Sequence, residues 1–154
     1  MNEIAKIDPY KIHLETVRVT NGSIHSNPDI DKSKIEECTT NFDVTYGVAP
    51  DTNSVRFIFK VRLEAITVNK EVLEANAEYT TEYIFKVDNL SEFIALKDKS
   101  VILDVSMAAT LMGIVYSTTR GIILSRTQGT LLDGVIIPIL SPIDLLNSTK
   151  KALK

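Results

Sequence analysis

The 154-residue sequence predicts an α+β fold in which a long helix and a shorter C-terminal helix lie on one face of an antiparallel sheet. Two patterns predict the two layers. Residues 55–66 and 75–87 alternate apolar and polar side chains, the period of two that is typical of strands with one buried face. Residues 100–121 are instead apolar at helical spacing, around almost the whole circumference of a helix. Such a helix has to be covered, and the apolar face of the sheet is the surface that the chain offers.

The two long strands are joined by a turn around Asn69 and Lys70 and predict an antiparallel hairpin. One face of this hairpin is aromatic and apolar, and the other is mostly charged. On the charged face, Glu64, Glu78 and Glu82 share the surface with arginines and lysines. We therefore interpret these carboxylates as members of cross-strand ion pairs.

Two shorter strands are predicted before the hairpin. The first covers residues 10–20, and its alternation slips near Glu15 and Thr16, which predicts a β-bulge or a strand that turns a corner. The second covers residues 42–46, where every other side chain is apolar. The polar stretch 21–37 is rich in turn formers, so we expect a long surface connection between the two strands.

The long helix is predicted to begin with Ser100 as its N-cap, because serine accepts hydrogen bonds from the first free backbone amides of a helix. Asp104 would then lie in the first turns, where a negative charge suits the helix dipole. Arg120 and Gly121 predict the end of the helix, as a basic last turn followed by a glycine.

One line along this helix is polar, and all its members are small: Ser106, Thr110, Gly113 and Ser117. Small residues let another backbone approach closely, so we expect this line to meet a partner subunit. The alternative is a helix buried within one monomer, or an apolar face left partly exposed. Because Asp104 interrupts the apolar run, which is shorter than the roughly 18 to 20 residues that a bilayer requires, we expect no membrane insertion.

After the long helix the chain is predicted to be extended and apolar over residues 122–124 and 135–140. The sequence Ser141-Pro142-Ile143-Asp144 then predicts a helix start, with serine as N-cap and proline in the first turn. The last helix therefore runs from about Pro142 into the C-terminal lysines.

Composition limits the class of protein. With 44% hydrophobic residues, 24% charged residues and a net charge of −3, residues 1–154 fit a single domain with a hydrophobic core. No basic stripe points to a nucleic-acid partner. The lone Cys38 excludes an internal disulfide, and no signal peptide is recognised, so we expect a cytoplasmic protein.

The sequence carries no pattern that predicts catalysis. It has no glycine-rich phosphate loop, no paired Cys or His spacing for a metal, and no nucleophile elbow. Neither His13 nor His25 has an acidic residue at a spacing that indicates a catalytic pair. We interpret Cys38 as a small apolar side chain that fills space in the core. We expect no enzyme, no catalytic residue, no metal and no cofactor.

In its order of elements the chain resembles the SecB-type export chaperones. The order is a strand, a long loop, three antiparallel strands, a long helix, an extended segment and a short last helix. The residues that carry the resemblance lie in the first strand, the hairpin, the end of the long helix, the extended segment and the last helix: 10–15, 55–63, 83–87, 116–121, 137–138 and 142–146.

This resemblance implies a four-stranded antiparallel sheet with both helices on one face, assembled as a homotetramer, a dimer of dimers. It also implies an ATP-independent holdase that binds unfolded polypeptide or preprotein clients in apolar grooves, with a role in protein export. By position, the groove residues are Phe42, Val44 and Tyr46 of the second strand and Leu145 and Leu146 of the last helix. The alternative is that these side chains fill the monomer core.

Contact with the secretion motor ATPase is less well supported by the resemblance. Glu15 and Glu78 match the family's motor-contact positions, but Lys11 stands where an acid is expected and Asn76 where a leucine is expected. A SecB-like chaperone of a toxin–antitoxin system is therefore an alternative. A second alternative, from another class, is a hot-dog-like domain that binds a small ligand or acts on an acyl thioester.

Overall fold

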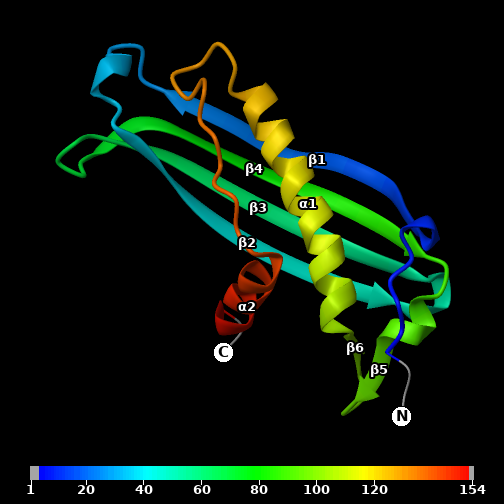
Figure 1. Ribbon diagram of the computed structural model, residues 1–154. Coiled ribbons are helices and arrows are strands. Elements are labelled where there is room, and N and C mark those ends of the chain that lie inside the picture. The colour runs from blue at the N-terminus through cyan, green and yellow to red at the C-terminus, as the bar shows by residue number, and fades with distance from the viewer. Residues whose placement is uncertain (1–3, 153–154) are drawn as a thin grey trace.

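The structure is a computed structural model that describes residues 4–152. A four-stranded antiparallel sheet of order β1–β4–β3–β2 carries two helices on one face, and a small β5–β6 hairpin projects from one end (Figure 1). This arrangement confirms the predicted fold class. The elements are β1 Ile12–Ser26, β2 Glu37–Ala49, β3 Ser54–Ile66, β4 Val72–Val87, β5 Ile94–Lys97, β6 Ser100–Leu103, α1 Val105–Arg126 and α2 Pro142–Ala152.

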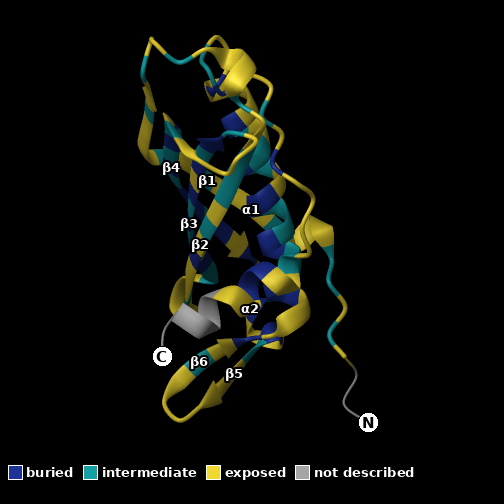
Figure 2. Cartoon of the chain, turned by 90° about the vertical axis from the view of Figure 1, so that its left-hand side faces the viewer, coloured by how far each residue is buried: buried dark blue, intermediate teal, exposed yellow. Residues whose placement is uncertain are grey.

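The core lies between the sheet and α1, and the β3–β4 hairpin supplies most of its sheet side (Figure 2). Val55 pairs with Phe85 and Phe57 with Tyr83, and all four side chains are fully buried. Burying an aromatic or branched side chain contributes about 1.5–3 kcal/mol, so this row accounts for much of the stabilisation. The apolar positions that predicted the hairpin are the buried positions in the structure, and the polar positions between them are more exposed.

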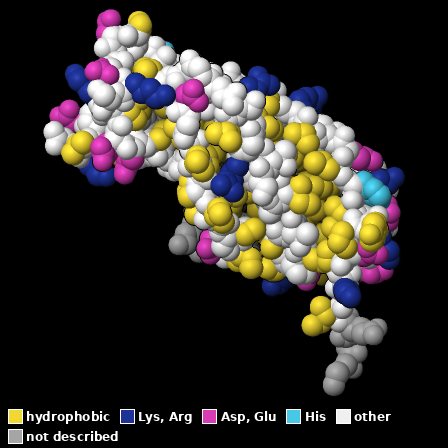
Figure 3. Space-filling view, turned by 45° about the horizontal axis from the view of Figure 1, so that its top comes forward, with side chains coloured by type: hydrophobic (Ala, Val, Ile, Leu, Met, Phe, Trp, Pro, Cys, Tyr) yellow, Lys and Arg dark blue, Asp and Glu magenta, His cyan; other side chains and the backbone are white. Residues whose placement is uncertain are grey.

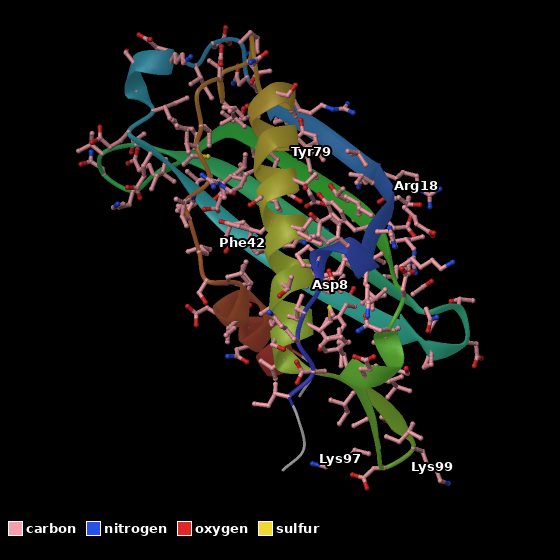
Figure 4. The ribbon with its side chains drawn as sticks, turned by 45° about the vertical axis from the view of Figure 1, so that its right-hand side comes forward. Asp8, Arg18, Phe42, Tyr79, Lys97 and Lys99 are labelled. Atoms are coloured by element: carbon pink, nitrogen blue, oxygen red, sulfur yellow. The ribbon has the colours of Figure 1, made fainter. Side chains whose placement is uncertain are left out.

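The outer face of the sheet, which bears no helix, holds the predicted cross-strand ion pairs. Glu82 accepts hydrogen bonds from Arg18 of β1 and Arg56 of β3, so three adjacent strands are linked through one carboxylate. Figure 4 labels Arg18, which projects from β1. In the same way, Glu78 pairs with Lys60 at 2.9 Å and with Arg62 at 2.8 Å.

Both predicted ends of the long helix were wrong. Ser100 belongs to β6, and Asp104 is the N-cap of α1, accepting hydrogen bonds from the amides of Ser106 and Met107. Residues 100–103 form β6 and pair with β5, where Leu103 lies opposite Ile94. The helix therefore starts only after residue 103.

The helix also continues past Gly121, through the stretch 122–124 that we expected to be extended. Gly121 lacks the left-handed backbone of a helix-terminating glycine, and an interior glycine costs a helix only about 1 kcal/mol. Ile123, one turn from Thr119, is fully buried, and its burial offsets that cost. The chain turns away instead at Gly129 and Gly134, both of which have positive φ.

The β-bulge predicted near Glu15 is present, as a register shift between Leu14 and Thr16, and β1 has a second shift between Val19 and Asn21. The strand then runs on to Ser26, whereas residues after 20 were predicted to be a loop. Gly22 pairs with Tyr79 of β4, because β4 is long enough to supply partners for this extension.

With 22 residues, α1 is long and apolar enough to cross a bilayer by length and composition alone. In this structure it lies across the sheet and buries one side, including Leu111, Met112 and Val115. That placement is the one expected of the core helix of a domain. The predicted last helix is confirmed as α2, which begins at Pro142.

Candidate functional site

The three predicted groove residues of β2 point toward the helix-bearing face but differ in exposure. Val44 is 2% exposed and belongs to the core. Phe42 is half-buried and contacts the rings of Phe59 and Tyr116, with centroids 5.8 and 5.7 Å away. Tyr46 is 39% exposed and stacks on Phe57, so it presents one side to solvent. Only Tyr46 offers substantial free surface in the monomer.

The two predicted groove residues of α2 lie on the inner side of that helix. Leu145 and Leu146 are 4% and 7% exposed and pack into the core beside β2. Among the α2 side chains whose burial the structure describes, the large apolar one presented to solvent is Ile143. In this monomer, Leu145 and Leu146 therefore fix the position of α2, and Ile143 is the residue available for contact.

A surface that the sequence analysis did not single out lies along residues 135–140, the extended stretch between α1 and α2. This stretch, which we call the crossing segment, runs beside α1 (Figure 1). Ile136 is 73% exposed and Ile139 is 84% exposed, whereas Ile137 between them is 3% exposed. The segment is thus anchored by one side chain and presents its neighbours outward.

Two side chains of α1 hold the backbone of the crossing segment. The Tyr116 hydroxyl donates to the carbonyl oxygen of Pro138 at 2.5 Å, and Arg120 Nε donates to the carbonyl oxygen of Ile137 at 2.9 Å. Burial raises the pKa of the Tyr116 phenol, so this donor stays protonated. These bonds fix a backbone that belongs to no helix or sheet, and they keep the exposed isoleucines in place.

Hollows lie on both sides of the crossing segment. One, of about 240 Å³, separates it from α1, where the small residues Ser117 and Gly121 leave room beside Leu124. The other, of about 430 Å³, lies toward the β1–β2 connection and includes Ile35 and Cys38 in its lining. Val135 and Ile136 line both hollows, so the two hollows form one continuous groove, which we call the crossing-segment groove. Its centre is apolar, and the second hollow is also lined by the charged residues Lys32, Glu36, Glu37 and Asp133. Hydrophobic side chains also gather on this side of the molecule in Figure 3.

The line of small residues on α1 has two parts in the structure. Ser106 and Thr110 bond within the first turns, and Gly113 faces α2, since a Cβ there would lie 3.7 Å from Pro142 Cγ. Ser117 is exposed and borders the crossing-segment groove. The prediction that this line meets a partner subunit stays a prediction.

The two positions that match motor contacts lie apart from this groove. Glu15 is exposed on β1 beside the first bulge. Glu78 lies on the outer face, where hydrogen bonds from Lys60 and Arg62 lower the pKa of its carboxyl. Its charge is thus balanced by two cations within the chain.

The titratable groups show no catalytic arrangement in the part of the chain that the structure describes. His13 lies at the surface, 3.0 Å from Asp88, and burial raises the pKa of the Cys38 thiol, which makes it a weaker nucleophile. Among residues 4–152 no group of three or more His, Cys, Asp or Glu side chains is placed to hold a metal ion.

Comparison with known proteins identifies the fold. No protein-family model matches the chain, and no curated protein sequence matches it either. Among solved structures, the Mycobacterium tuberculosis Rv1957 SecB-like chaperone, in complex with a ChAD peptide from the Rv1956 HigA1 antitoxin, matches with a TM-score of 0.58. The match covers 86% of this chain and 92% of that chain, at 14% sequence identity. This chain has a SecB-like fold.

A protein of unknown function from Streptococcus agalactiae also matches, at 15% identity, over 83% of this chain and 97% of that chain. Its TM-score of 0.36 is too low for any argument. The SecB-like fold replaces the hot-dog-like alternative, in keeping with a long helix that follows the fourth strand of the sheet.

Proposed function

We propose that this SecB-like chain is an ATP-independent holdase chaperone, not an enzyme, and that it binds unfolded polypeptide in the crossing-segment groove. The observation that carries this proposal is the row of exposed isoleucines, Ile136 and Ile139, on a backbone that Tyr116 and Arg120 hold in place. Contiguous apolar side chains that are exposed on a protein surface often mark an interaction site.

The chemistry of the groove suits clients of many different sequences. Its centre is aliphatic, at Val135 and Ile136, and selects for apolar character and extended shape, whereas charged side chains line the hollow toward the β1–β2 connection. Tyr46 and Ile143 lie on the same face of the molecule and extend the apolar surface that a long client would meet. The Rv1957 structure, with its bound antitoxin peptide, supports a polypeptide as the occupant.

A toxin–antitoxin client is favoured over coupling to the secretion motor. Glu78, one of two matching motor positions, is paired with Lys60 and Arg62, and Lys11 adds a positive charge where an acid is expected. An acidic contact surface for the motor is therefore weakened at two positions, Glu78 and Lys11. A role in export requires that the motor bind elsewhere.

The proposal includes a homotetramer in the cytoplasm, built as a dimer of dimers. Its support is the start of α1, away from the groove, where Val105 is 59% exposed beside the exposed Ser106. Small residues flanked by exposed aliphatic ones suit close contact with another helix.

The test is suppression of aggregation of a chemically unfolded client, without nucleotide, by wild type and by the double variant Ile136→Asp with Ile139→Asp. Both side chains are exposed, so the variant should fold, and we expect it to lose most of its holding activity. The matched control is Val68→Asp with Leu96→Asp, which places the same charges at residues 70% and 81% exposed, in the β3–β4 turn and in β5, outside the lining of the groove. Equal activity of both double variants would refute the groove assignment.

A further inference from the structure

Both helices lie on one face of the sheet (Figure 1), and the opposite, outer face carries a hollow of about 410 Å³ near the end of β2. Most of its lining is apolar. Small-molecule sites in proteins begin at about 300 Å³, so the hollow is large enough for a compact ligand. Side chains of β2 and β3 that alternate with the core residues supply the outer-face part of the lining: Thr45, Gly47, Ala49, Ser54, Arg56 and Ile58.

Two features of the sequence leave this space open. Gly47 has no side chain, and a Cβ added there would meet nothing within 4 Å. Its φ lies outside the left-handed region and the register across it is continuous, so neither a turn nor a bulge requires glycine. Arg56, opposite Gly47 on β3, leans away from it, because Arg56 Nε donates to Glu82 of β4 at 2.6 Å and β4 lies on the far side of β3. Glycine inside a strand often marks a position where a ligand approaches the backbone closely.

The rim of the hollow carries a positive charge. Of the residues that line the hollow in the described part of the chain, Arg56 alone is charged. Its partner Glu82 is shared with Arg18, so one carboxylate faces two guanidinium groups and does not neutralise both. The terminal nitrogens of Arg56 make no hydrogen bond to the residues that the structure describes, and they stay available as donors. Apolar walls with one such cation suit a ligand that has an apolar body and one anionic group.

We propose that this hollow binds a small aromatic carboxylate, with its ring over Gly47 and its carboxylate paired with the guanidinium of Arg56. Glycine on an edge strand leaves a flat strip of exposed backbone, over which an aromatic ring packs well. The planar guanidinium fork matches the geometry of a carboxylate. This is a second site, on the face of the sheet opposite the crossing-segment groove, and it goes beyond the proposed function.

The experiment titrates isotopically labelled protein with phenylacetate and follows, by NMR, the amide signal of Gly47 and the Nε–H signal of Arg56. We expect both signals to shift with a Kd of about 1 mM, as for other small ligands held by few polar contacts. Phenylacetamide keeps the ring and removes the charge, and it should bind about tenfold more weakly, the effect of losing a charged hydrogen bond. Acetate keeps the charge and lacks the ring, and it should also bind at least about tenfold more weakly.

Two pairs of variants test the two halves of the site. Gly47→Leu fills the hollow and should weaken phenylacetate binding at least about tenfold. The matched control Asn41→Leu adds the same side chain on the same face, about 20 Å along the strand, and should bind as wild type does. Arg56→Gln should remove the preference for phenylacetate over phenylacetamide, and Arg56→Lys should keep a preference because it keeps the charge.

Four results would overturn the site. The first is that neither the Gly47 nor the Arg56 signal moves with phenylacetate, and the second is equal affinity of wild type for phenylacetate and phenylacetamide, a comparison that needs no variant. The third is undiminished phenylacetate binding by Gly47→Leu. The fourth is a lower solution mass of Gly47→Leu than of Asn41→Leu, which would assign the hollow to a second copy of the chain.

Discussion

Removing the hydroxyl of Tyr116 should loosen the crossing segment without disturbing the core. Tyr116→Phe keeps the ring that packs edge-on against Phe42 and Phe59, and it loses only the hydrogen bond to the carbonyl oxygen of Pro138. Pro138 is exposed, so water can replace the lost donor. The cost is that of one net hydrogen bond, about 1 kcal/mol, and corresponds to a fall in Tm of about 2–4 °C.

The functional effect should exceed the effect on stability. Without its tether to Tyr116, the crossing segment keeps the bond from Arg120 and the burial of Ile137, and its exposed isoleucines are less firmly positioned. We expect faster hydrogen exchange in residues 135–140 and weaker suppression of client aggregation, measured on the same sample.

The matched control is Tyr79→Phe. Tyr79 is 4% exposed, and its hydroxyl has no hydrogen bond among the residues that the structure describes. This variant should leave both exchange of residues 135–140 and holding activity unchanged. The reasoning would be refuted if Tyr116→Phe exchanged and held client as wild type does, or if both variants behaved alike.

The remaining predictions concern α1 and the outer face. Asp104→Ala removes the N-cap of α1 and should cost about 1 kcal/mol, read as a lower urea midpoint, whereas Ser100→Ala should have almost no effect. Gly121→Ala should raise the free energy of unfolding by up to about 1 kcal/mol, read as a higher urea midpoint, since a Cβ there meets nothing within 4 Å. It should also weaken client binding because it narrows the hollow beside Leu124, and a lower urea midpoint would contradict this reasoning. Hydrogen bonds from Arg18 and Arg56 lower the pKa of Glu82, so its stabilising effect is present above the ordinary carboxyl pKa and is lost as pH falls through the lowered value. Glu82→Gln should therefore flatten the acid side of the stability profile, measured as urea midpoint from about pH 7 to about pH 3, and an unchanged profile would exclude the carboxylate as its source.

The sheet could be predicted from sequence because its signal is local. In β3 and β4, each side chain's face follows from its position along the strand, and burial of Phe57, Phe59 and Tyr83 matches that alternation. The last helix was also predictable, because Ser141 and Pro142 mark its start within a few residues.

The ends of α1 depend on contacts that no local pattern contains. Ser100 and Asp104 are both suitable caps, and the choice between them is made by pairing of Leu103 with Ile94 in the β5–β6 hairpin. At the other end, Gly121 has the composition of a helix stop, but buried Ile123 carries the helix past it.

The candidate site was predicted less well than the fold, because exposure depends on how distant segments dock. Val44, Leu145 and Leu146 look like groove residues by position, yet α2 packs beside β2 and buries all three. Ile136 and Ile139 lie in an apolar run visible in the sequence, but nothing in that run shows which side chains face outward. That is decided by Tyr116 and Arg120, about twenty residues away in the chain, which bond to its backbone.

The most direct test of the holdase function is the mass, by light scattering, of this protein mixed with a permanently unfolded client in the absence of nucleotide. Wild type should form a stable complex heavier than either component, and the variant Ile136→Asp with Ile139→Asp should not. A wild-type sample in which protein and client migrate separately would contradict the holdase function. A complex that forms equally well with the double variant would contradict the crossing-segment groove as its site.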